Sequence, residues 1–150
     1  MNTQDEIKEL KKRIAELEEQ VEQEKEFPQD GDKYWLIEET LGVSRYAWAG
    51  DDFDNKLLSV GNVFRTKEQA EFAVEKLKVE AELRKYSRPF KNGWDNYNII
   101  LTDNESVNTA YWSGVQSQGS IHFESRDKAQ QAIESVGEDR IKKYIFGVED

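Results

Sequence analysis

The 150-residue chain contains no cysteine, one histidine, one methionine and two prolines. The lack of cysteine excludes disulfide bonds, thiolate metal sites and cysteine nucleophiles, and it fits a reducing compartment. No apolar run approaches the ~18 residues that a membrane-spanning helix needs. The first six residues are polar and acidic, unlike a secretory signal peptide. We therefore expect a soluble protein of the cytoplasm with no membrane partner.

Patterns typical of enzymes are also scarce. The sequence has no Gly-x-Ser-x-Gly nucleophile motif and no Gly-rich phosphate-binding loop. Its only histidine, His122, stands between Ile121 and Phe123 in a predicted strand, and we expect a surface or structural residue rather than a base. Zinc needs about three or four nitrogen or sulfur ligands, which this chain does not offer. We expect no catalytic residues, no cofactor and no metal site.

One carboxylate-rich segment, residues 51–55, is the densest candidate for binding Mg²⁺ or Ca²⁺. It lacks the alternating acidic spacing and the glycine of a calcium-binding loop. We interpret it as a solvated acidic turn.

Charge and aromatic content divide the chain into two parts. Acidic residues exceed basic ones by 31 to 21, and residues 1–30 alone carry a net charge of −5. Phe27 is the only aromatic residue in that segment, and the proline and glycine that follow it are typical of a helix end. The composition predicts a coiled-coil helix over residues 1–27, a linker over 28–33 and an α+β domain over 34–150.

The first part has the 3-4 spacing of apolar residues that is typical of a coiled-coil seam. β-Branched residues at the a positions with leucine at the d positions favour a parallel two-stranded pairing. In that register Glu6 would face the partner's Lys11, and Arg13 would face the partner's Glu18. We expect a homodimer, with a trimer and a helix packed on its own domain as the alternatives. The seam consists of Ile7, Leu10, Ile14, Leu17 and Val21.

The second part contains an internal repeat. Residues 64–77 match residues 123–136 in kind at a constant offset of 59 positions. Each copy combines the end of a strand, a hydroxyl residue suited to a helix N-cap (Thr66 or Ser125) and a helix with small apolar residues on one face. This pattern predicts two β-β-β-α units in one compact domain, over residues 34–86 and 97–148. The expected strands are 33–39, 43–49 and 61–64, then 97–102, 109–113 and 120–123, with a last helix over 138–145.

Two stretches carry a resemblance to other proteins. GNVFRTKEQAEFAVEKLKV at residues 61–79 and VGEDRIKKYIFGV at residues 136–148 resemble small uncharacterised proteins of phages, prophages and other mobile elements of Gram-positive bacteria. Those proteins also tend to carry a leucine-rich N-terminal helix and a Tyr-Trp opening strand. The resemblance implies an accessory phage product acting in the host bacterial cytoplasm, a class rich in inhibitors of host defence. It transfers no catalytic residue.

From charge and this resemblance we expect a non-enzymatic protein that binds and inhibits a host protein, as an anti-CRISPR-type inhibitor does. An acidic face could take the place of nucleic acid in a basic cleft of a nucleic-acid-binding enzyme. The same negative charge disfavours direct binding to duplex DNA, because that binding needs positive surface. The candidate contacts are Glu16, Glu19, Glu22, Asp51, Asp52, Asp54 and Trp94, the last of which could instead cover a sheet edge.

Two other functions remain open. A basic cluster after the first predicted repeat helix could bind a nucleotide signal, with its aromatic residues stacking on the base. It could equally complement the dipole at the end of that helix. The cluster comprises Arg84, Lys85, Tyr86, Arg88, Phe90 and Lys91. The third possibility is a virion or assembly component that oligomerises through the coiled coil.

Overall fold

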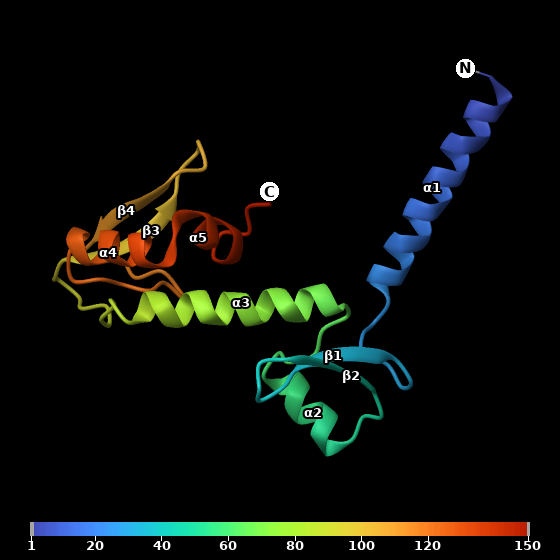
Figure 1. The fold of residues 1–150 in the computed structure, drawn as a ribbon, viewed down its shortest axis with the longest axis horizontal. Helices are drawn as coiled ribbons and strands as arrows, with labels where there is room; N and C mark the ends of the chain where they lie inside the picture. The colour runs from blue at the N-terminus through green and yellow to red at the C-terminus, as the bar shows by residue number, and fades with distance from the viewer. Residues whose placement is uncertain (1, 150) are drawn as a thin grey trace. The chain divides into compact units, whose positions relative to one another are not determined.

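The computed structural model describes residues 2–149 and has an α+β fold (Figure 1). It divides into two compact units, which are described separately. One comprises residues up to Leu36 together with Ser44–Thr66; the other comprises Ile37–Val43 and the chain from Lys67 onward. The elements in chain order are α1 (Thr3–Glu24), β1 (Lys33–Ile37), β2 (Val43–Ala47), α2 (Asp52–Ser59), α3 (Lys67–Arg84), β3 (Asn96–Leu101), β4 (Val107–Trp112), α4 (Arg126–Val136) and α5 (Glu138–Tyr144).

The first unit is built on a small aromatic core below the β1–β2 hairpin. Tyr34, Leu36 and Trp48 are buried, and Phe27, Leu57 and Val63 pack against them. The rings of Tyr34 and Trp48 meet edge to face, with their centroids 5.8 Å apart. Such a small core leaves the long α1 outside it.

The base of α1 is attached to this unit by one arginine. The guanidinium of Arg65 donates hydrogen bonds to the carbonyl oxygens of Glu22 at 3.3 Å and Lys25 at 2.7 Å. It also lies over the ring of Phe27, 4.6 Å from its centroid. Carbonyl groups at a helix C-terminus have no partner within the helix, so these bonds stabilise the end of α1.

The second unit packs α4 and α5 against the β3–β4 hairpin and against α3 (Figure 1). Ser125 caps α4 by accepting a hydrogen bond from the backbone N–H of Lys128 at 3.1 Å, and Gly137 ends the helix with a positive φ of 101°. Arg140 of α5 forms an ion pair with Glu82 of α3 at 2.7 Å. The buried core comprises Val79, Leu83, Phe123, Ala129, Ala132, Ile133, Val136 and Ile141.

The predicted fold class and N-terminal helix are confirmed, whereas the pair of β-β-β-α units is not. Each half contains a hairpin, but the expected third strand is reduced to a single bridge, Trp35 to Phe64 in one half and Tyr97 to Phe123 in the other. The first half also contains α2, a helix that we did not predict and that the second half lacks. The two halves therefore share a hairpin, a bridge and a helix. They differ in the segment between the hairpin and the bridge, where only the first half contains a helix.

Candidate functional site: the exposed seam of helix α1

Helix α1 presents its whole apolar seam to solvent. Along Thr3–Glu24, all of which the structure describes, no side chain is buried. The five seam residues are between 43% and 64% exposed. The alternative in which α1 packs on its own domain is therefore not the arrangement in this structure.

The sequence explains why this segment is helical. The side chain of Asn2 caps the N-terminus by accepting a hydrogen bond from the backbone N–H of Asp5 at 2.9 Å. Asp5 and Glu6 in the first turn complement the positive end of the helix dipole. Beyond Glu24 the backbone of Lys25 is extended, and the helix ends there. Because most helix stability in proteins comes from packing of an apolar face, an uncovered helix of this kind gains from a partner.

Charged side chains flank the seam at the positions expected for pairing. Arg13 now forms an ion pair along the helix with Glu16, at 3.5 Å, and both side chains are exposed. Exposed pairs of this kind contribute little to stability, so little free energy holds Arg13 to Glu16.

The predicted acidic contacts lie in two elements and differ in their hydrogen bonds and ion pairs. Glu16, Glu19 and Glu22 are exposed along α1. Asp51 caps α2 by accepting a hydrogen bond from the N–H of Asp54 at 2.9 Å, and Asp52 pairs with Lys56 at 2.8 Å. These residues lie in a helix start rather than in the solvated turn that we predicted.

Asp54 corrects the prediction of an exposed acidic contact, because it is only 3% exposed. Its carboxylate accepts hydrogen bonds from the hydroxyl of Tyr34 at 2.5 Å and from the backbone N–H groups of Ala49 and Gly50 at 2.7 and 3.1 Å. These bonds, that of Tyr34 first, lower the pKa of Asp54. Burial, followed by the bond with Asp54, raises the pKa of Tyr34. Asp54 thus holds the first unit together and cannot contact a partner.

Three residues of the basic cluster, Arg84, Arg88 and Phe90, line one cavity, and both guanidinium groups already have partners within the protein. The guanidinium of Arg88 donates to the carbonyl oxygens of Pro89 and Asp95 and to the side chain of Asn96. Arg84 pairs with Glu80 at 3.7 Å. Lys91 Nζ lies 4.5 Å from the ring centroid of Trp94. Trp94, a predicted partner contact, is 61% exposed. The cluster mainly organises the loop before β3, so it supports the structural alternative.

His122 lies inside the second unit rather than on its surface. It is buried, and its ring lies edge to face against Phe90 with centroids 5.2 Å apart. Burial, with a smaller effect from the nearby charge of Arg88, lowers the pKa of His122. A neutral imidazole in this position fits the expectation of a structural histidine.

Sequence reasoning missed Asn96, which is fully buried at the start of β3. Its amide donates to the carbonyl oxygens of Lys91, Trp94 and Trp112 at 2.9 to 3.1 Å. Its side-chain oxygen accepts from the N–H of Lys91 and from Arg88. The only signal in the sequence is a turn-forming Gly-Trp-Asp-Asn run, which does not show which residue will be buried.

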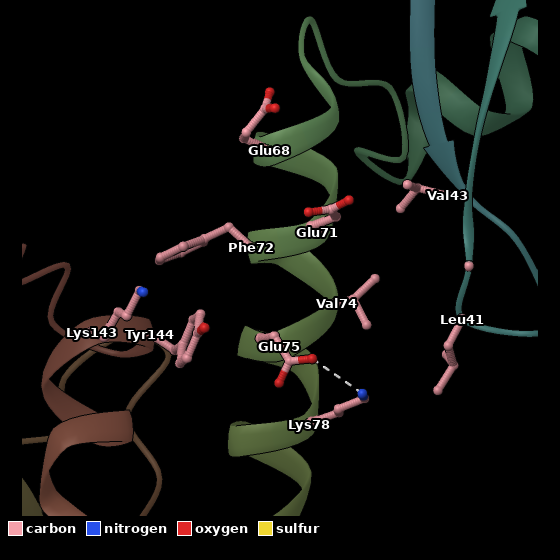
Figure 2. Close-up of a pocket in the computed structure, with 11 residues that line it drawn as sticks. Leu41, Val43, Glu68, Glu71, Phe72, Val74, Glu75, Lys78, Lys143 and Tyr144 are labelled. Carbon is pink, nitrogen blue, oxygen red and sulfur yellow. Dashed lines mark hydrogen bonds and ion pairs between the residues drawn. The ribbon is translucent and has the colours of Figure 1, made fainter.

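A pocket in the second unit is lined by carboxylates and by two aromatic rings. Figure 2 shows Glu68, Glu71 and Glu75 along α3, with Phe72 turned toward Tyr144 of α5. The two rings have centroids 5.0 Å apart, and Glu75 pairs with Lys78 at 3.1 Å. Within residues 2–149 no three acidic or histidine side chains group closely enough to hold a metal ion.

The chain matches no protein-family model, and no curated protein or solved structure shows significant similarity to it. In the part of the chain that the structure describes, no helix combines the length and the apolar character needed to cross a membrane.

Proposed function

We propose that this is a non-enzymatic binding protein that works as a homodimer, joined by a parallel coiled coil of two α1 helices. The observation that carries the proposal is the exposure of all five seam residues on a 22-residue helix without a buried side chain. A monomer would leave this stripe in water, whereas pairing removes it from water on both helices.

A second copy fits the seam better than an unrelated helix because the flanking charges are self-complementary. In the parallel register, Glu6 faces the partner's Lys11 and Arg13 faces the partner's Glu18. The two-fold symmetry of the dimer repeats both ion pairs on its other side. Opposite charges at these positions favour this alignment over a shifted one.

We further propose that the dimer is a phage or mobile-element product that acts in the host cytoplasm on a host protein. Support comes from the sequence resemblance at residues 61–79 and 136–148 and from the net charge of −10. Dimerisation doubles the exposed carboxylates of Glu16, Glu19 and Glu22, and these can bind a basic cleft. Inhibition of a nucleic-acid-binding host enzyme is the form of activity that this charge fits best.

We also infer that the two halves are variants of one hairpin-and-helix plan. Phe64 and Phe123 occupy matching positions in the repeat, and each makes the single bridge to the first strand of its half. On this plan α2 is an additional element of the first half.

The dimer is tested by measuring molar mass in solution by light scattering, for the intact chain and for an Ile14→Asp/Leu17→Asp variant. We expect a dimer for the former and loss of α1-mediated association for the latter, because two buried carboxylates would face two others in the seam. The matched control, Ala15→Asp/Gln23→Asp, adds the same charge on the exposed side of α1 and keeps the dimer. Equal masses for the intact chain and the seam variant at every concentration, including the lowest, would contradict the proposal.

The target is tested by affinity capture from host lysate with the same three proteins, followed by an activity assay of any captured enzyme. A host enzyme retained and inhibited by the intact protein and by the control variant supports the inhibitor function. Co-purification of nucleotides alone, or of virion proteins alone, would contradict it in favour of the two other functions.

A further inference from the structure

Strand β4 is an edge strand whose outer side has a short open window. β4 pairs only with β3 in its sheet, with Tyr111 opposite Tyr97. Tyr97 exchanges both backbone hydrogen bonds with Phe123, so its N–H and C=O point away from β4. The backbone groups of the opposing Tyr111 therefore point away from β3, and so do those of Thr109, two residues earlier.

Both ends of this edge are closed. The N–H of Val107 donates to the carboxylate of Glu138 at 3.2 Å. At the other end, the C=O of Ser113 accepts from the N–H of Gly93 at 2.8 Å. Within residues 2–149, the outward N–H and C=O groups of Thr109 and Tyr111 take part in no hydrogen bond. Each of these two residues therefore offers one donor and one acceptor.

Between its closed ends at Val107 and Ser113, this edge lacks the protection that soluble proteins normally give an open strand. Charged residues, prolines and bulges usually block edge pairing. Residues 106–123 contain no Asp, Glu, Lys or Arg and no proline, although 35% of the whole chain is charged. Tyr111 is 52% exposed, and Trp112 beside it is also exposed. The open window thus lies in the longest uncharged stretch of the sequence.

We propose that β4 pairs antiparallel with β4 of a second copy, about a two-fold axis at Ala110. In this register Thr109 lies opposite Tyr111 of the second copy and Tyr111 opposite its Thr109, which gives four backbone hydrogen bonds. Ala110 faces Ala110 of the second copy at a non-hydrogen-bonded position, where the strands are closest and a small side chain fits. The two hairpins become one four-stranded sheet.

The closed ends select this register. A shift toward the start of β4 places Tyr111 opposite Val107 of the second copy, whose N–H is bonded to Glu138. A shift the other way places Thr109 opposite Ser113, whose C=O is bonded to Gly93. A second copy fits this window because the register is self-complementary: Thr109 and Tyr111 each offer one donor and one acceptor, and the same two residues of the second copy accept and donate them. The lack of charged residues in 106–123 keeps the repulsion between the two acidic chains low at this edge. This interface is independent of the α1 seam.

Cysteine cross-linking tests the register directly, because the natural chain has no cysteine. Facing residues at a non-hydrogen-bonded antiparallel position have Cα atoms about 4.5 Å apart, within the range of a disulfide. We expect Ala110→Cys to form a disulfide-linked dimer about tenfold faster or more than the control Asn108→Cys, which faces Trp112 of the second copy. Adding Thr109→Pro removes one outward N–H without breaking a β3–β4 bond, and it abolishes the advantage.

All three variants are also prepared with Ile14→Asp/Leu17→Asp, and near-ultraviolet circular dichroism verifies that each is folded. Faster cross-linking of Ala110→Cys in this background supports the β4 interface even if the α1 dimer fails. Equal rates for Ala110→Cys and Asn108→Cys, or a rate unaffected by Thr109→Pro, would overturn it. A monomeric hairpin that binds only strands of other proteins gives equal rates and is thereby distinguished.

Discussion

The hydrogen bonds around Asp54 bear on how single residues set the stability of the first unit. Tyr34 and Asp54 lie twenty positions apart in the chain and are both buried, so their hydroxyl–carboxylate bond fixes α2 against β1. The sequence shows three aspartates within four positions, and nothing in that pattern distinguishes the buried one from the cap and the exposed one. Asp54 is the buried one because it meets the hydroxyl of Tyr34 in β1 and the N–H groups of Ala49 and Gly50.

We expect Tyr34→Phe to lower the free energy of unfolding by about 1–3 kcal/mol, because it leaves a buried carboxylate with one donor fewer. The matched control is Tyr111→Phe, which removes an exposed hydrogen bond to Asp95 of 3.1 Å and changes stability by less than about 0.5 kcal/mol. Urea unfolding followed by tryptophan fluorescence measures both. Equal effects of the two substitutions would show that the buried Tyr34 bond contributes no more to the free energy of unfolding than the exposed Tyr111 bond.

The lowered pKa of Asp54 predicts a pH dependence. Its usual value is 3.8, so the ionised group contributes stability above that pH and loses it as pH falls through the lower folded-state pKa. We expect Asp54→Asn to have a clearly lower free energy of unfolding than the natural chain at pH 7. The difference between the two free energies becomes smaller below pH ~4. Urea unfolding of both proteins from pH 7 to pH 3 measures it. A gap that stays constant over this range would contradict the assignment.

At the scale of elements, periodicity predicted the helices better than the strands. The 3-4 spacing located α1, and Ser125 marked the start of α4 where the structure has it. The expected third strands failed because only Phe64 and Phe123 find a backbone partner. Helix α2 was missed because its apolar residues, Phe53, Leu57 and Leu58, are too few in eight residues to establish a helical period, and its acidic start resembles a turn. Sequence patterns thus identified the helices that are specified by neighbouring residues, and missed the elements that depend on contacts with distant parts of the chain.

The direction of the α1 helices is a prediction at this scale. Thr3 occupies a d position of the heptad, so in a parallel dimer the two copies of residue 3 face each other. We expect Thr3→Cys chains to cross-link with one another under mild oxidation. In a mixture with mass-tagged Glu24→Cys chains, a parallel pair gives no mixed product, because the two ends are about 30 Å apart. Mixed cross-links as the main product would show an antiparallel pair instead.

For the whole molecule, two self-complementary surfaces have a joint consequence. The α1 seam belongs to the first unit and β4 to the second, and each is proposed to bind a second copy. If both bind within the same pair of chains, the second contact becomes intramolecular and gains from a high effective concentration. If they bind different chains, two two-fold contacts per molecule generate assemblies larger than a dimer.

Light scattering over a range of concentrations distinguishes these two cases. We expect the Ile14→Asp/Leu17→Asp variant to dimerise only at high concentration through β4, since four backbone hydrogen bonds form a small interface. We expect Thr109→Pro to remain a dimer through α1, and the combined variant to have the monomer mass of 17.5 kDa.

A natural chain that stays dimeric at every concentration indicates both contacts in one pair, and a mass that rises with concentration indicates contacts between pairs. A combined variant that is still dimeric would show that neither surface accounts for self-association, because both would then have been removed without effect.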